Sequence, residues 1–175
     1  AAWFTTAKIL QWPTSGGISA LSVSTRDLDL VETVLPLFRH LGWRGVAEVE
    51  LKIDDRDGEA KLIEVNPRVW GYWGFPVCCG VNFPALWCQA AMDRPLPAAG
   101  LGDYRVGVTY INPPAYLQAL CSDRPLTGGG TALLRRLRRE LRGPLVGNNL
   151  DWRDGLVILA KMLYEARAGR RSGGR

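Results

Sequence analysis

Oxygen-bearing side chains recur at every second position in two neighbouring segments, residues 45–53 and 60–66. An Asp-Gly pair lies between the segments, which is a strong signal for a β-hairpin. We expect the hairpin to close symmetrically around Asp57, with Asp54 opposite Ala60. Because side chains alternate between the two faces of a strand, four of these side chains then share one face. They are Glu48, Glu50, Glu64 and Asn66.

In this register Glu50 lies directly opposite Glu64, and two carboxylates in that arrangement repel each other. A cation between them would remove the repulsion. Together with the amide oxygen of Asn66, they form a set of hard oxygen donors, which suits Mg²⁺. Zn²⁺ prefers Cys or His ligands, and the single histidine, His40, lies outside the hairpin. Arg68 offers a planar donor group for phosphate or carboxylate. The alternative is a solvent-facing strand with ordinary charges.

The elements before the hairpin are expected to be a strand, a glycine loop and a helix. Residues 3–12 are typical of a strand, and residues 14–19 form a loop centred on glycine. The helix is expected at about 26–41, with Thr25 as its N-cap and Gly42 at its end. The second face of the hairpin predicts a core, made of Ala47, Val49, Leu51, Ile53, Ile63 and Val65.

The chain after the hairpin is expected to be mainly helical. A short helix is predicted at 84–92 and a strand at 104–112. Leucines at helical spacing predict a basic amphipathic helix at 133–141 and a last helix at 151–167. Residues 169–175 are expected to be disordered. The fold class is therefore α+β, an antiparallel sheet with flanking helices followed by a mostly helical extension.

The composition indicates a folded domain, because 47% of the 175 residues are hydrophobic. No apolar run approaches the roughly 20 residues that span a bilayer. We expect no membrane partner and a cytoplasmic location. The net charge of +5 is uneven: residues 1–132 hold 11 basic and 13 acidic side chains, and residues 133–175 hold 11 and 4. A basic end can bind nucleic acid or anionic lipid, or it can be a solvated helical face.

The hairpin and its flanks carry a recognisable series of motifs. At these positions the sequence resembles the ATP-grasp superfamily, in the subgroup related to carbamoyl-phosphate synthetase and biotin carboxylase. The resemblance covers about residues 8–95 and is weaker through 103–165. The motifs are Gly45–Asp54, Asp57-Gly58, Lys61–Arg68, Val69-Trp70-Gly71 and Cys79–Pro84, with Trp12–Gly17 upstream.

The resemblance implies which residues bind the metal and the nucleotide. Enzymes of this family bind ATP between two α+β subdomains and hold Mg²⁺, or alternatively Mn²⁺, with two Glu and one Asn. Carried over by position, the metal ligands are Glu50, Glu64 and Asn66, while Glu48 precedes the family position. Arg68 matches a catalytic arginine near the phosphates and the acyl substrate. The cofactor-binding positions are Lys8, which aligns loosely, and the loop glycines Gly16 and Gly17.

The resemblance also implies a domain organisation. Residues 1–100 would be the C-terminal ATP-grasp subdomain, 101–168 a mainly helical extension and 169–175 a tail. The family's nucleotide pocket also needs an earlier subdomain, so we expect the N-terminal part of the same enzyme to be missing. The chain by itself is therefore expected to be inactive.

The expected function is an ATP- and Mg²⁺-dependent ligase. A small carboxylate substrate would be activated as an acyl phosphate, and an amine or another nucleophile would attack it. The chain could form a homodimer. The competing hypothesis is a non-catalytic binding module whose basic C-terminal helices contact an acidic partner or nucleic acid. Residues 133–150 contain no aromatic side chain, which argues against a nucleic-acid groove.

Overall fold

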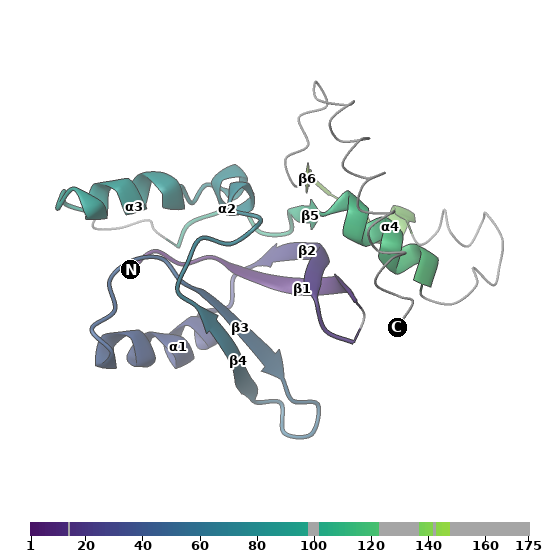
Figure 1. Ribbon diagram of the computed structural model, residues 1–175, viewed down its shortest axis with the longest axis horizontal. Helices are drawn as coiled ribbons and strands as arrows, with labels where there is room; N and C mark the ends of the chain where they lie inside the picture. Colours follow the sequence, from purple (N-terminus) through teal and green to yellow (C-terminus); the bar gives the residue numbers. More distant parts are fainter. Residues whose placement is uncertain (14, 98–101, 123–136, 142, 148–175) are drawn as a thin grey trace, which may run out of the picture. The chain divides into compact units, whose positions relative to one another are not determined.

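The fold is α+β, as expected, with short helices and strands along the chain (Figure 1). The structure is a computed structural model that describes residues 1–13, 15–97, 102–122, 137–141 and 143–147. The predicted helix at 151–167 and the predicted tail at 169–175 lie outside these residues, as do residues 133–136 of the predicted helix at 133–141, of which residues 137–140 are helical. Within the described part of the chain, no helix is long and apolar enough to cross a membrane.

The chain divides into two compact units. The first unit contains residues 1–5 and 26–104, and the second contains residues 6–25 and 105–175. The predicted hairpin therefore belongs to the first unit, and the predicted glycine loop belongs to the second. The domain boundaries expected from the sequence stay a prediction.

The second unit is built on a four-stranded sheet. Its strands, in sheet order, are β1 (Thr5–Trp12), β2 (Ile18–Thr25), β5 (Thr109–Ile111) and β6 (Leu145–Gly147). The pairing of β2 with β5 is antiparallel, with Leu21 opposite Ile111, whereas β5 and β6 are parallel. The sheet is therefore mixed, and the prediction of a purely antiparallel sheet is wrong in this respect.

The core of the second unit lies where helix α4 (Pro113–Ser122) packs against β2. Buried serines in β2 are tolerated because they are hydrogen-bonded. Ser24 Oγ donates to the carbonyl of Arg105 and accepts from the N–H of Val108, both at 3.0 Å. The sequence-based expectations omit β2, α4 and β6. The buried cluster consists of Ala20, Leu21, Ile111, Ala115 and Tyr116.

Helix α1 (Leu28–His40) opens the main part of the first unit. Its N-cap is Asp27, whose Oδ1 accepts a hydrogen bond from the N–H of Leu30 (3.1 Å). The prediction of Thr25 as the N-cap is therefore wrong. The negative charge of a carboxylate at this position also interacts favourably with the positive end of the helix dipole. No residue of α1 is buried.

The end of α1 is confirmed at Gly42, which adopts a φ of +57°. Its N–H donates to the carbonyl of Arg39 (3.1 Å), and the N–H of Trp43 donates to the carbonyl of Phe38 (2.9 Å). These two bonds form a Schellman motif, which satisfies carbonyls that the helix leaves unpaired. The motif fixes the backbone from which the Trp43 side chain projects.

The predicted hairpin is formed by the antiparallel strands β3 (Glu48–Ile53) and β4 (Ala60–Asn66). At the end remote from the turn, the register is the one derived from the sequence. This part of the prediction matters most, because it decides which side chains share a face. Both predicted pairs are confirmed there: Glu48 lies opposite Asn66, and Glu50 lies opposite Glu64.

Nearer the turn the register shifts by one residue, and Ile63 is the additional residue of a β-bulge on β4. Ala60 consequently pairs with Ile53, so the prediction of Asp54 opposite Ala60 is wrong. The prediction of a core on the second face is also wrong, because none of its six residues is buried. Ile53 is 48% exposed and Ile63 is 58% exposed.

Two short helices follow the hairpin, α2 (Gly74–Cys79) and α3 (Phe83–Ala91). An aromatic cluster joins them, because the ring of Trp70 lies 4.9 Å from that of Trp73 and 5.3 Å from that of Phe83. These edge-on contacts fix the region that leads from the hairpin to α3. The buried apolar residues of the described part of the first unit are Trp70, Phe75, Pro76, Cys79, Val81 and Tyr104.

Candidate metal centre and adjoining groove

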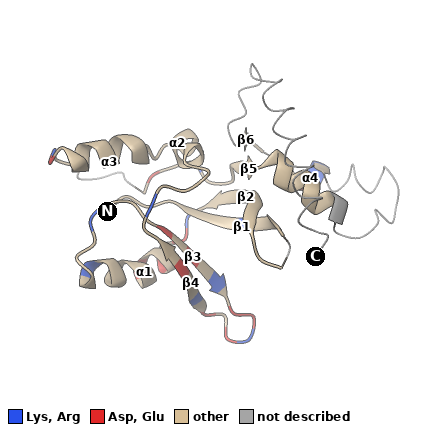
Figure 2. Cartoon of the chain, viewed as in Figure 1, with Lys and Arg blue, Asp and Glu red and all other residues tan. Residues whose placement is uncertain are grey.

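One end of the hairpin carries three carboxylates and an amide, on Glu48, Glu50, Glu64 and Asn66, which we call the carboxylate face. Acidic positions occur on both strands (Figure 2). Glu50 and Glu64 are direct cross-strand partners, so their side chains lie on the same side of the hairpin. Two like charges at this spacing destabilise a hairpin that holds no cation.

The amide of Asn66 is oriented by its two neighbours. Its Nδ2 donates to Oε1 of Glu64 (2.6 Å), and its Oδ1 accepts from Nη2 of Arg68 (3.5 Å). The amide therefore presents nitrogen to the carboxylate. Rotation of the amide by half a turn would present Oδ1 there instead, which completes a set of two carboxylates and one amide oxygen. After this rotation, the donor set fits Mg²⁺ or Mn²⁺.

Glu48 shares the face but has a different environment. Its Oε1 accepts a hydrogen bond from the hydroxyl of Tyr72 (2.8 Å), and the ring of Tyr72 contacts Trp70 at 6.3 Å. Among the described residues, no group of three or more His, Cys, Asp or Glu side chains is arranged to hold a metal ion. Glu48 therefore does not complete a three-carboxylate cluster, and its contact is a link between the hairpin and the aromatic cluster.

Arg68 lies at the edge of the carboxylate face. Its Nη1 donates to the carbonyl of Val69 (3.1 Å), and its Nη2 reaches Asn66. The side chain is exposed, and no carboxylate among the described residues pairs with it. Its guanidinium can therefore bind an anion placed beside Asn66.

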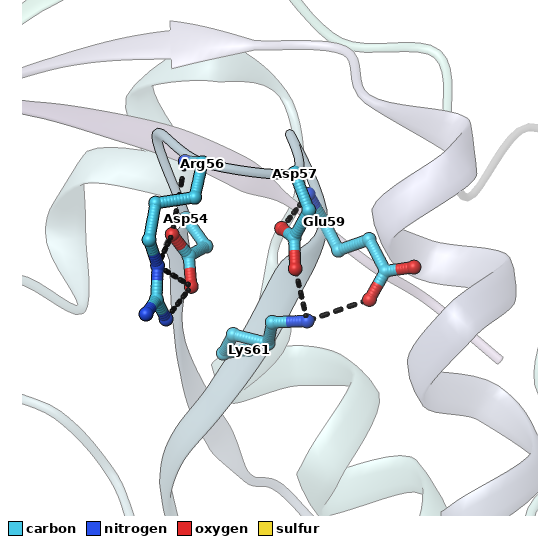
Figure 3. A network of polar contacts seen from close by, with 5 residues as sticks. All are labelled: Asp54, Arg56, Asp57, Glu59 and Lys61. Atoms are coloured by element: carbon cyan, nitrogen blue, oxygen red, sulfur yellow. Dashed lines mark hydrogen bonds and ion pairs between the residues drawn. The ribbon is translucent and has the colours of Figure 1, made fainter.

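The turn end of the same hairpin is also rich in carboxylates, but there each carboxylate of the network contacts a cation (Figure 3). Arg56 forms a two-pronged contact with Asp54, with Nε 2.9 Å from Oδ1 and Nη2 2.6 Å from Oδ2. Lys61 lies 2.9 Å from Asp57 and 2.6 Å from Glu59. We call these five residues the charged turn.

These contacts change the pKa of the groups in the charged turn. Hydrogen bonds from Arg56, chiefly through its side chain, hold the pKa of Asp54 below its usual value. The backbone N–H of Glu59, followed by Lys61, lowers the pKa of Asp57. Glu59, followed by Asp57, raises the pKa of Lys61. None of these groups is buried, and all except Asp54 are exposed, so their contribution to stability is small.

The charged turn also explains the shifted register. The N–H of Asp54 donates to the carbonyl of Glu59 (2.9 Å), and the N–H of Gly58 donates to the carbonyl of Asp54 (2.8 Å). The carboxylates of Asp54 and Asp57 each accept from a backbone N–H two residues further on, as in Asx-turns. This closure pairs Asp54 with Glu59 in place of Ala60, and the bulge restores the predicted pairing on the carboxylate face.

A groove of about 500 Å³ lies beside Arg68 in the first unit. Two tryptophans line the groove: Trp43 is 40% exposed and Trp87 is 45% exposed. The sequence analysis missed this site, although Trp43 and Arg44 directly before a strand could have indicated it. We call it the Trp–Arg groove, and its lining is Trp43, Arg44, Gly45, Val46, Pro67, Arg68, Val69 and Trp87.

The other predicted cofactor-binding residues belong to the second unit. Lys8 lies on β1 and is exposed, and Gly16 and Gly17 lie between β1 and β2. An added Cβ on Gly17 would lie 2.2 Å from the carbonyl oxygen of Trp12, so the backbone itself requires glycine there. A role for these three residues in binding a cofactor stays a prediction.

Comparison with known proteins adds no relative. No protein-family model, no curated protein and no solved structure matches the chain.

Proposed function

We propose that this chain carries the metal and phosphate site of an ATP-dependent ligase that activates a carboxylate. The observation that carries the proposal is the pairing of Glu50 with Glu64, with Asn66 hydrogen-bonded to Glu64 on the same face. Opposed carboxylates destabilise a hairpin, and a divalent cation that bridges them would remove this cost. The resemblance of the surrounding motifs to the ATP-grasp superfamily supplies the reaction class.

The reaction has two steps. An oxygen of the substrate carboxylate attacks the γ-phosphorus of ATP, so that an acyl phosphate forms as the bond to ADP breaks. The nitrogen of an amine then attacks the acyl carbon, a C–N bond forms, phosphate leaves, and the amine proton passes to solvent. Such chemistry needs positioning and charge neutralisation more than covalent participation by the protein.

The residues divide this work between them. Glu50, Glu64 and Asn66 would hold a divalent ion, which neutralises the phosphate oxygens when bound. Arg68 would orient the transferring phosphoryl group or the substrate carboxylate, since it lies beside Asn66 and has no carboxylate partner among the described residues. Glu48 would act indirectly, by fixing β3 through Tyr72.

The metal site can be tested on this chain with Mn²⁺ alone, by electron paramagnetic resonance of the unbound ion. We expect one Mn²⁺ to bind weakly, because two carboxylates and an amide leave several positions to water. Glu50→Gln and Glu64→Gln should each weaken binding at least about tenfold, since each removes a charged ligand.

The matched control is Glu59→Gln, which removes a carboxylate from the charged turn of the same hairpin. Its affinity for Mn²⁺ should equal that of the unchanged chain. Equal affinity in Glu64→Gln, or no Mn²⁺ binding to the unchanged chain at millimolar concentration, would refute the metal site.

A further inference from the structure

The Trp–Arg groove exposes large apolar side chains to water. Trp43 and Trp87 expose large indole rings, although a tryptophan side chain gains much free energy when it is covered. Both rings border one cavity of about 500 Å³, a volume typical of small-molecule sites. Exposed aromatic side chains that gather in one groove indicate a surface that is covered by a ligand.

The charge of the groove indicates the sign of that ligand. Arg44 and Arg68 line the groove, and no Asp or Glu does. Arg44 is exposed, and it forms no hydrogen bond or ion pair with any residue that the structure describes. Arg68 bonds only to the carbonyl of Val69 and the amide of Asn66 in the described part of the chain. Two guanidinium groups without acidic partners favour an anion.

The walls of the groove are held by the fold. The backbone of Trp43 is fixed by the Schellman motif that ends α1. Trp87 lies on α3, and its ring contacts that of Trp73 edge-on at 6.2 Å. Trp73 in turn contacts Trp70, which is 8% exposed. A wall fixed in this way loses little conformational freedom when it binds a ligand.

We propose that the Trp–Arg groove binds a small planar aromatic carboxylate, with its ring against Trp43 and Trp87 and its carboxylate at Arg44 and Arg68. Planar rings and indoles pack well against each other, and a carboxylate matches the fork of a guanidinium. The lining contains no carboxylate, and its two guanidinium groups disfavour a cationic ligand. The chemical class is therefore an aromatic acid.

Arg68 connects the groove to the carboxylate face, because its Nη2 lies 3.5 Å from Oδ1 of Asn66. An acid group bound by Arg68 is therefore next to the proposed metal ligands. The aromatic acid is accordingly the substrate that the ligase activates, and this assignment rests on the proposed function. The binding itself does not, since the groove residues are distinct from Glu50 and Glu64.

The test is a titration of the chain with 2-naphthoate, followed by ¹H–¹⁵N NMR of the indole N–H groups, with no metal and no nucleotide. We expect saturable shifts at the indoles of Trp43 and Trp87. Arg44→Gln, which removes no hydrogen bond or ion pair within the described residues, should weaken binding at least about tenfold. Trp87→Ala should weaken it similarly. The matched control, Arg39→Gln, removes an exposed arginine from α1 and should leave the affinity unchanged.

Two further ligands test the chemical class. The neutral analogue 2-naphthamide should bind at least about tenfold more weakly than 2-naphthoate, and so should the non-aromatic acid cyclohexanecarboxylate. Equal binding of 2-naphthamide would overturn the recognition of an anion, and equal binding of cyclohexanecarboxylate would overturn the aromatic class. No saturable shift with 2-naphthoate, or full affinity in Arg44→Gln, would overturn the site.

The variant Glu64→Gln separates this proposal from the proposed function. We expect it to bind 2-naphthoate with unchanged affinity while it loses Mn²⁺. If the unchanged chain binds Mn²⁺ but not 2-naphthoate, the groove alone is contradicted. If it binds 2-naphthoate but not Mn²⁺, the metal site alone is contradicted.

Discussion

The carboxylates at the two ends of the hairpin have different partners. In the charged turn, each carboxylate has a cationic partner within 3 Å, Arg56 for Asp54 and Lys61 for Asp57 and Glu59. On the carboxylate face, Glu64 faces another glutamate, and its described partner is the neutral amide of Asn66. Both ends are acidic and neither has a buried carboxylate, so composition alone does not distinguish them.

The presence or absence of a local cationic partner is a criterion that distinguishes a carboxylate that stabilises the fold from a carboxylate that can bind a ligand. Balanced charges at a turn help to set its geometry, and their local partners satisfy them. Carboxylates opposed across a strand pair cost stability, and such local cost is commonly found at functional sites. In the proposed function, a divalent metal ion is the partner of the carboxylate face.

The largest expected effect is on catalysis. In the complete polypeptide encoded by the gene, Glu64→Gln should reduce Mg²⁺-dependent release of ADP at least about 100-fold. A lost metal ligand removes several kcal/mol of transition-state stabilisation, and about 1.4 kcal/mol is a factor of ten. The variant should keep its fold by circular dichroism, because glutamine can still accept from the amide of Asn66.

The same assay on Glu59→Gln compares the two ends directly. This variant alters the charged turn and should retain nearly full turnover. If both variants lost activity alike, the hairpin as a whole would be needed, and the carboxylate face would have no special role.

The pairing on the carboxylate face was predictable because it depends on the alternation of side chains, which the sequence displays directly. The bulge at Ile63 was not, since it results from how Asp54 closes the turn with Glu59. A closed turn of this kind depends on side-chain hydrogen bonds to the backbone, which the Asp-Gly signal does not specify. The closed turn and the bulge compensate for each other, so the pairing of Glu50 with Glu64 was predicted correctly from an incorrect turn.

The second unit was less predictable for a related reason. Strand β2 has serines interspersed among apolar residues, and both Ser22 and Ser24 are buried. Partners distant in sequence, such as Val108, satisfy Ser24 and make this burial possible. The Trp–Arg groove was also missed, because its walls come from the end of α1, the end of β4 and α3. Periodicity within one segment does not indicate which segments will meet.

A smaller effect should appear in stability, with opposite signs at the two ends. In the absence of divalent ions, Glu64→Gln should raise the free energy of unfolding by about 0.2–1 kcal/mol, because it removes the repulsion by Glu50. Lys61→Gln should lower it slightly, because Asp57 and Glu59 lose their cation. Urea denaturation followed by circular dichroism measures both values. A Glu64→Gln variant less stable than the unchanged chain would show that Glu64 is already balanced.

The smallest effect is the pH dependence of the charged turn. Arg56 lowers the pKa of Asp54 from its usual 3.8, so the folded state binds this proton less readily than the unfolded state does. The resulting stability is present above pH 3.8 and is lost as the pH falls through the lowered pKa. For Lys61 the sign is reversed: its pKa is raised from 10.5, so its contribution to stability is present below pH 10.5 and is lost as the pH rises through the raised value.

NMR titration of the side-chain carboxyl carbons should place the midpoint of Asp54 below 3.8 and return it towards 3.8 in Arg56→Gln. The midpoint of Asp57 serves as the internal control, because its shift comes from Glu59 and Lys61 and should persist in that variant. An unchanged midpoint for Asp54 in Arg56→Gln would mean that the contact with Arg56 in Figure 3 does not lower the pKa of Asp54. The proposed difference between the two ends of the hairpin would then be wrong for Asp54.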